Sequence, residues 1–480
     1  MIRLGPFEID PRTWMLRRDA QPVDLSPRLV EILAFLAQRN GEIVTKEELL
    51  ERFWRDVHVT DNTLTRAIAD IRGALGDSAS EPRYIQTLAR RGYRCVSVSS
   101  TAGAAGGDPF EEWVKGRLAL ESLDITQLPA AITRFETAVA ELPSYAPAYA
   151  GLANAYLLQF ESTRFTNLPD RALLDKAITA ARRACSVDPS LGEGWAVLGY
   201  LLNAAGQLSE SLAAARRATA LEPDNWRHQF RLACSTWGEE RLRAADRTID
   251  LMPSFAAARM MSAMVFVARG VLARAEQEAA TGAELQRQGG GHAPMRAAGL
   301  HWLRGLILAA RGDPGGALAC FEEEAAAAGD GHVYGREFAA NALVAAGWVL
   351  FTREDPDHAI EMFTRALAQT PTHARATLGL AAARIHQAAA LARDEALAPV
   401  RRALDELGRG GRRHEAALVQ AGELIVRGQV GDAVALLDTL LDQSPPGPAG
   451  WIIPVDPMLT AVRFSPGRTG IMAKLAARAS

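Results

Sequence analysis

Two short segments near the N-terminus carry side chains suited to contacting a nucleic acid. In the first, Asp61 to Leu75, polar and apolar residues alternate at helical spacing. The second is the pair Arg90 and Arg91, which Gly92 follows. Hydrogen-bonding side chains on a helix can read base edges in a major groove, and guanidinium groups bind phosphates. These residue types favour a surface for double-stranded DNA.

The stretch from Asp61 to Leu75 is predicted to be a helix with one buried face. Four apolar residues recur at offsets of 0, 4, 7 and 11, which places them on one stripe: Leu64, Ile68, Ile71 and Leu75. Gly73 costs about 1 kcal/mol of helix stability relative to alanine, so close approach to DNA or a position near the helix end must explain it. The outer face and its flanks consist of Asn62, Thr63, Thr65, Arg66, Ala69, Asp70, Arg72 and Gly73.

The elements that must position this helix lie within residues 1 to 98. Turn signals separate three short predicted strands, and capping signals at Ser26-Pro27 and at Thr45 to Glu48 begin two helices before the one at Asp61. A hairpin follows, with Ala89 to Gly92 as its turn. The predicted elements are strands Arg3–Ile9, Trp14–Arg17 and Val23–Leu25, helices Pro27–Asn40, Thr45–Trp54 and Asp61–Gly76, and strands Tyr84–Leu88 and Tyr93–Val98.

Two sequence motifs in this region resemble a known family. FWRDVHVTDNTLTRAIADIRGALG at 53 to 76 and PRYIQTLARRGYRCV at 82 to 96 are similar to the OmpR/PhoB-type winged helix, in the variant of CadC- and ToxR-like bacterial regulators. The resemblance implies a four-stranded sheet, a three-helix core and a C-terminal wing. It also implies that the helix from Asp61 enters the major groove, that the wing carries Arg90 and Arg91, and that the loop Arg55–Thr60 contacts RNA polymerase.

The residues at the recognition surface differ from the family in one respect. Many relatives carry basic residues where this chain has Ala69 and Asp70. Asp70 can accept a hydrogen bond from cytosine or serve as a surface salt-bridge partner. We expect Thr65 and Arg66 to contact bases, and Thr63, Arg72, Arg90 and Arg91 to contact phosphates. The full predicted DNA-binding set is Asn62, Thr63, Thr65, Arg66, Ala69, Asp70, Arg72, Thr87, Arg90, Arg91 and Tyr93.

The region from 109 to about 445 is helical and repetitive. Small or aromatic residues and a proline recur at spacings of 4, 3 and 5, and Pro189 to Pro223 spans 34 residues. This resembles the tetratricopeptide repeat, in roughly eight units, with an insertion near Glu161 to Asp170 and an interruption at Gln288 to Pro294. Four repeats show the spacing: Ala131, Phe135, Ala138, Pro143; Ala177, Ala181, Ala184, Pro189; Ser211, Ala215, Ala218, Pro223; and Ala359, Phe363, Ala366, Pro371.

The predicted architecture is therefore multidomain. An α+β winged helix at 1–98 precedes a Gly-rich flexible linker at 99–108, an all-α tetratricopeptide-repeat solenoid at 109–445 and a capping segment at 446–480. Repeat units bury their apolar faces by stacking, which leaves a concave groove that usually binds a peptide or protein.

Composition limits the class of protein. The formal net charge is −3, and within residues 1 to 98 a basic excess appears only in 62 to 94, with six arginines against three acidic residues. The four isolated cysteines are predicted to be free buried thiols of a reducing cytoplasm. No signal peptide or apolar run long enough to cross a membrane is found. No metal-ligand spacing, cofactor motif or catalytic constellation appears either, so neither catalysis nor a cofactor is expected.

These observations predict a cytoplasmic, sequence-specific DNA-binding transcriptional regulator whose solenoid senses a signal or binds a protein partner. The alternative is a cytoplasmic protein-interaction scaffold in which the winged helix is a weak DNA- or protein-binding module. A third hypothesis is small-molecule sensing in the solenoid groove.

Overall fold

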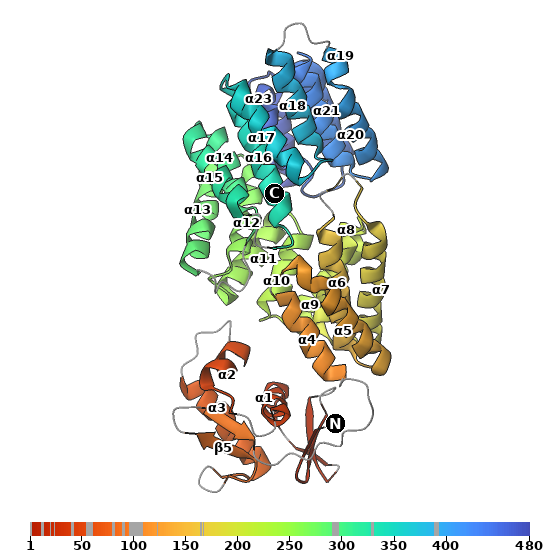
Figure 1. Ribbon diagram of the computed structural model, residues 1–480, viewed down its shortest axis with the longest axis vertical. Helices are drawn as coiled ribbons and strands as arrows, with labels where there is room; N and C mark the ends of the chain where they lie inside the picture. Colours follow the sequence, from red (N-terminus) through yellow and green to blue (C-terminus); the bar gives the residue numbers. More distant parts are fainter. Residues whose placement is uncertain are drawn as a thin grey trace. The chain divides into compact units, whose positions relative to one another are not determined.

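The chain divides into two units, Met1–Phe110 and Glu111–Ser480, in the computed structural model (Figure 1). The described residues are 2–10, 14–19, 21–23, 25–39, 43–53, 61–78, 82–88, 92–95, 109–121, 123–163, 166, 168–289, 297–327, 331–387 and 393–480. The predicted linker at 99–108, the 55–60 loop and the pair Arg90-Arg91 lie outside them.

The first unit begins with an antiparallel sheet in the order β1 (Ile2–Leu4), β2 (Phe7–Asp10), β3 (Met15–Arg18) and β4 (Gln21–Val23). The prediction of one strand from Arg3 to Ile9 is wrong. Gly5 has a φ of +61°, which turns the chain tightly so that Leu4 pairs with Phe7. The strand predicted at 23–25 also ends earlier, at Val23. The sheet therefore has the four strands that the family resemblance implied.

Three helices and a hairpin complete this unit: α1 (Pro27–Gln38), α2 (Lys46–Phe53), α3 (Asp61–Leu75), β5 (Ile85–Leu88) and β6 (Gly92–Cys95). Their order confirms the predicted one. Val44, just before α2, pairs with Tyr93 and so joins the hairpin to the helices. Thr45 caps α2, because its Oγ1 accepts a hydrogen bond from the backbone N–H of Glu48 at 3.0 Å.

The second unit is a solenoid of helix pairs that stack in chain order (Figure 1). The first helix of most pairs also contacts the first helix of the next, so these first helices form the inner wall of the solenoid. The pairs are α4 (Pro109–Glu121) with α5 (Leu128–Glu141), α6 (Ala146–Glu161) with α7 (Arg171–Val187), α8 (Gly192–Ala204) with α9 (Leu208–Leu221), α10 (Trp226–Ser235) with α11 (Gly238–Leu251), α12 (Ala256–Ala268) with α13 (Leu272–Gly289), α14 (Leu300–Ala310) with α15 (Pro314–Ala326), α16 (Gly335–Thr352) with α17 (Pro356–Gln369), α18 (Ala374–Gln387) with α20 (Ala398–Arg409), and α21 (Arg413–Val426) with α22 (Val430–Gln443).

The repeat spacing marks the helix crossings. All twelve helical residues of the four predicted repeats are buried, and each of the four prolines follows the end of a second helix. A Cβ added to Gly151 or Gly379 would overlap the ring of Phe135 or Phe363, respectively. These glycines let two helices approach closely around one aromatic ring, which is the packing that the tetratricopeptide pattern predicts.

Contacts between distant repeats close the solenoid on itself. Asp124, in the turn after α4, forms a β-bridge with His332, which precedes α16. Further along, Arg412 donates a hydrogen bond to the carbonyl oxygen of Thr166 at 2.7 Å, and Arg171 donates one to Gly410 at 3.3 Å. The predicted insertion after α6 therefore contacts the turn before α21.

The C-terminal segment does more than cap the last repeat. After α22 the chain continues through a 3-10 turn (Pro457–Leu459) and helices α23 (Thr460–Arg463) and α24 (Arg468–Arg478), which pack on α22 and also on α12, α14, α16 and α21 of the inner wall. Figure 1 places the C-terminus beside α12, where Arg269 donates a hydrogen bond to the carbonyl oxygen of Ala479 at 2.8 Å.

The burial of this segment makes it a permanent part of the solenoid. Eight of its apolar side chains are almost completely enclosed: Ile452, Ile453, Val455, Met458, Leu459, Val462, Ile471 and Leu475. Each fully buried side chain of this kind contributes about 1.5–3 kcal/mol, so together they contribute on the order of 10 kcal/mol or more. A peptide could enter this part of the groove only by displacing these side chains, and its own apolar contacts would have to make up for the burial that is lost.

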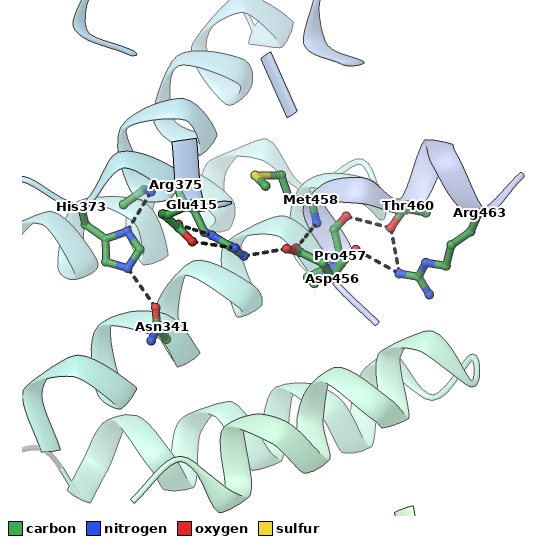
Figure 2. Close-up of polar contacts among 10 residues, drawn as sticks. Asn341, His373, Arg375, Glu415, Asp456, Pro457, Met458, Thr460 and Arg463 are labelled. Atoms are coloured by element: carbon green, nitrogen blue, oxygen red, sulfur yellow. Dashed lines mark hydrogen bonds and ion pairs between the residues drawn. The ribbon is translucent and has the colours of Figure 1, made fainter. Parts of the chain in front are cut away.

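A buried ion-pair cluster fixes the same segment (Figure 2). The guanidinium of Arg375, on α18, lies 2.6 Å from Glu415 of α21 and 2.6 Å from Asp456. Asp456 in turn accepts a hydrogen bond from the backbone N–H of Met458 at 3.0 Å. Arg375 is the shared partner of two carboxylates, so its removal would leave both without that counter-charge, and its pair with Asp456 joins the C-terminal segment to α18.

Candidate nucleic-acid interface

Helix α3 has the buried stripe that its sequence predicts. Leu64, Ile68, Ile71 and Leu75 are each at most 3% exposed and pack in the core of the first unit, where α3 contacts α1 and α2. The helix is therefore held on one side by apolar burial, and its other side is available to a ligand.

The outer face of α3 gathers most of the predicted base-contacting residues. Thr65, Arg66, Ala69 and Asp70 are exposed, and Thr63 is half-buried beside them. Asn62 lies in the first turn of the helix, and its side chain is outside the described ones. An arginine and a threonine on one exposed helix face can donate to and accept from base edges.

Gly73 also lies on this exposed side, in the last turn of α3. A Cβ built on it would meet no atom within 4 Å. No packing contact in the described part of the unit therefore requires a glycine there. Close approach to DNA and a position near the helix end remain the two explanations.

Arg72 connects α3 to the hairpin. Its Nη2 donates to the carbonyl oxygen of Ile85 at 2.7 Å and to the hydroxyl of Thr87 at 2.8 Å. The side chain is half-buried, so it positions the hairpin relative to the helix in addition to any contact with phosphate. Thr87 itself is exposed on β5.

Tyr93 lies opposite Thr87 in the hairpin register but is only 3% exposed. Its ring packs in the core of the unit, so it supports the wing from behind and offers little surface to a ligand. The positions of Arg90 and Arg91, between the two strands, are outside the described residues.

Sequence reasoning overlooked Asp77 as a positioning residue. Its carboxylate accepts hydrogen bonds from the backbone N–H groups of Arg83 at 2.7 Å and Ile85 at 2.8 Å. These bonds hold the loop after α3 against the start of β5. An aspartate directly after a helix-ending glycine is a common turn signal, so the sequence did contain a clue.

Other kinds of site have little support. Within the described ranges, no group of three His, Cys, Asp or Glu side chains is arranged to hold a metal ion. None of the four cysteines, all of which lie among the described residues, forms a disulfide; Cys234 is half-buried, whereas the others are buried as predicted. Burial raises the pKa of the Cys185 thiol to about 11, so it is a poor nucleophile. None of the helices in the described portion of the chain has both the length and the apolar character to cross a bilayer.

The fold and the exposed face of α3 define a winged-helix DNA-binding domain of the transcriptional-regulator class. Residues 20–95 match the family described as "Transcriptional regulatory protein, C terminal". This match confirms the OmpR/PhoB-type resemblance for the first unit.

The chain is similar to several known proteins over one or the other unit. It is 33% identical over 97 residues to the transcriptional activator CadC of Escherichia coli (strain K12), a match that covers 20% of this chain and 19% of CadC. The Klebsiella pneumoniae RstA DNA-binding domain, solved in complex with the RstA box, is 31% identical and covers 20% of this chain and 95% of that one, with a TM-score of 0.19. A tetratricopeptide repeat protein from Parabacteroides merdae is 15% identical and covers 57% of this chain and 98% of that one, with a TM-score of 0.39.

The similarity to CadC thus spans about a fifth of each protein. It describes the DNA-binding unit alone and leaves the role of the solenoid to be inferred from its own structure.

Proposed function

We propose that this protein is a sequence-specific transcriptional regulator in which α3 reads bases, the wing contacts phosphates and the solenoid receives the regulatory signal. The observation that carries the proposal is the exposed polar face of α3, opposite a fully buried stripe, in a unit that matches the DNA-binding domains of transcriptional regulators. The DNA-binding domain of RstA, similar in sequence, was solved in complex with its DNA.

In this proposal, the two parts of the interface make different contributions. Arg66 and Thr65 select the sequence, because they can reach base edges from the exposed face of α3. Arg90 and Arg91 supply affinity that is independent of sequence, because phosphate contacts carry no base information. Arg72 maintains the angle between the helix and the wing through its bonds to β5. A contact of the 55–60 loop with RNA polymerase would couple binding to transcription.

The test begins by selecting the preferred DNA sequence from a random pool with the full-length protein. Affinity for that sequence and for an unrelated duplex is then measured at several salt concentrations. Arg66→Ala is expected to cost about 1–3 kcal/mol on the selected sequence and much less on the unrelated one. Arg91→Ala should weaken both alike and reduce the salt slope by about 1.

The control is Arg182→Ala, which removes an exposed arginine of α7 that pairs with Glu210. It should leave both affinities unchanged. If the selection yields no preferred sequence, the scaffold alternative, in which the winged helix binds DNA weakly or binds protein, replaces the regulator. If Arg66→Ala lowers both affinities equally, Arg66 reads no base.

A further inference from the structure

The interior of the solenoid contains a cavity of about 600 Å³. Its wall comes from the inner-wall helices and the turns beside them, including Asn203, Leu208, Met264 and Trp302, and the segment Pro445–Ile452 closes one side. The volume lies in the range of sites for small molecules. Because the C-terminal segment is buried along the same wall, the remaining space favours a small molecule over an extended peptide.

The cavity wall includes a buried cation, Arg241, that forms no ion pair with any carboxylate among the described residues. Arg241 is 4% exposed and donates to the carbonyl oxygens of Ala233, Cys234 and Thr236, and its guanidinium stacks on Trp237. Its Nη1 is buried without a hydrogen-bond partner. A buried charge is costly unless an opposite charge accompanies it, and burial lowers the pKa of Arg241 to about 10.

The other charged groups of the cavity are largely engaged with protein. Arg375 and Glu415 form a bidentate pair, with Nε to Oε1 at 2.6 Å and Nη2 to Oε2 at 3.1 Å. Arg412 donates to Thr166, and Glu337 on α16 is the remaining carboxylate of the wall. The cation best placed to attract an anion is therefore Arg241, next to Asn203, whose amide donates to the same Cys234 carbonyl.

We propose that this cavity is a binding site for a small organic anion with an apolar body. Its acidic group would lie toward Arg241 and Asn203, and its apolar part would contact Leu208, Met264 and Trp302. Such an anion would be the signal that the solenoid receives. The inference rests on the proposed function in one respect only, namely that the bound ligand changes DNA binding.

Two dyes that share an aromatic body test the proposal on the full-length protein. Anilinonaphthalene sulfonate is anionic, and phenylnaphthylamine is its uncharged counterpart. Fluorescence titration should show saturable one-to-one binding of both, with the anionic dye bound about tenfold more tightly, as one charge-assisted hydrogen bond would provide. Equal affinities, tighter binding of the neutral dye or no saturable binding would overturn the proposal.

A matched pair of substitutions on α9 locates the site. Leu208 and Leu221 are both partly exposed, at 41% and 39%, but only Leu208 lines the cavity. Leu208→Trp should abolish saturable dye binding, whereas Leu221→Trp should leave it unchanged. If both variants bind the dyes like the native protein, the dyes bind elsewhere and the cavity is not the site.

A third variant tests the charge. Arg241→Met should weaken the anionic dye about tenfold and leave the neutral dye unaffected, so the neutral dye reports whether the cavity is still formed. An unchanged preference for the anion would exclude Arg241 as its partner. DNA affinity measured on the same preparations separates the two proposals, because dye binding does not require a functional winged helix.

Discussion

The two units bury their cores in different ways. The first unit combines a sheet, three helices and a hairpin around large side chains such as Phe7, Leu33 and Ile71, and no packing motif repeats. The solenoid repeats one type of helix crossing. At each crossing, an aromatic ring or a small side chain of a second helix packs against a glycine or alanine of a first helix, as Phe363 packs against Gly347 and Gly379. Stability of the first unit therefore depends on individual turns and caps, and that of the solenoid on the size of the residues at each crossing.

This difference predicts that equivalent substitutions have separable effects on the two units. Such effects can be measured if the unfolding of each unit is followed by hydrogen exchange with mass spectrometry, since a protein of two units need not unfold in a single transition.

The largest effect is expected at a solenoid crossing. Phe363→Ala removes a ring that is completely buried and meets Trp348 edge to face, with the ring centroids 5.6 Å apart. The free energy of unfolding of the solenoid should fall by about 3–5 kcal/mol, and that of the first unit should not change. Phe464→Ala is the control, because Phe464 is 84% exposed and its loss should change stability by no more than about 0.5 kcal/mol. A comparable loss in both variants would contradict the role of the crossing.

In the first unit, the equivalent weak point is a backbone position. Gly92 has a φ of +137°, and a Cβ on it would overlap the carbonyl oxygen of Val44. Gly92→Ala should destabilise the first unit by about 1–3 kcal/mol and leave the solenoid unchanged.

Gly73→Ala is the matched comparison on the recognition helix. It should stabilise the first unit by up to about 1 kcal/mol, because Gly73 has a helical backbone and free space around it. If DNA affinity falls despite that gain, Gly73 allows close approach to DNA. If DNA affinity is unchanged, the position near the helix end explains why a glycine occurs there.

Acid should affect the solenoid through His373. The imidazole donates from Nε2 to Asn341 at 3.1 Å and accepts at Nδ1 from the N–H of Ala376 at 3.4 Å, and burial lowers its pKa from 6.5 to about 4. The unfolded chain then binds a proton that the folded chain does not, so stability should fall by roughly 1–3 kcal/mol as the pH drops from 6.5 to 4.

His373→Gln should remove this part of the pH dependence. The control is His358→Gln. The hydrogen bond to Asp355 raises the pKa of His358, so protonation of this histidine stabilises the folded protein as the pH falls, whereas protonation of His373 destabilises it. Urea unfolding between pH 7 and pH 4 measures both. A separate loss is expected from about pH 4.5 down to about pH 2, because burial, which raises the pKa of Glu415, is outweighed by Arg375 and Arg412, which lower it from 4.5 to about 2.

The smallest loss of stability is expected at a helix cap. Thr45→Ala removes the hydrogen bond to the N–H of Glu48 and should destabilise the first unit by about 1 kcal/mol. Thr133→Ala removes an exposed threonine within α5, whose hydroxyl donates to the carbonyl oxygen of Pro129, and should change the stability of the solenoid by no more than about 0.5 kcal/mol. If Thr45→Ala lowers stability no more than the control substitution does, contacts other than the Thr45 cap fix the start of α2.

Much of the local structure was predictable because it depends on near neighbours in sequence. The apolar stripe of α3 follows from spacing, and the twelve helical residues that the repeat spacing picks out in four repeats are all buried. The strand at 3–9 was misjudged because Gly5-Pro6 is a short turn inside an otherwise alternating run.

Contacts between residues far apart in sequence were not predictable from one chain. Nothing in the residues near Asp456 or Arg375 indicates that they meet across 81 positions, and the hydrogen bonds of Arg72 to β5 depend on how the hairpin packs on α3. The cavity has the same origin, because its wall combines several helices with a segment from beyond the last repeat.

The docking of the C-terminus has a consequence for how many repeats this protein can have. An open solenoid can gain or lose a repeat, because each unit contacts only its neighbours. Here Ala479 bonds to Arg269, a Cβ on Gly238 would meet the backbone of Ser480, and the second and last helix pairs meet through Thr166 and Arg412. An extra helix pair between Arg269 and Arg412 would lie within all three closures and would move their partners out of reach, so the length of the solenoid is set by its closure.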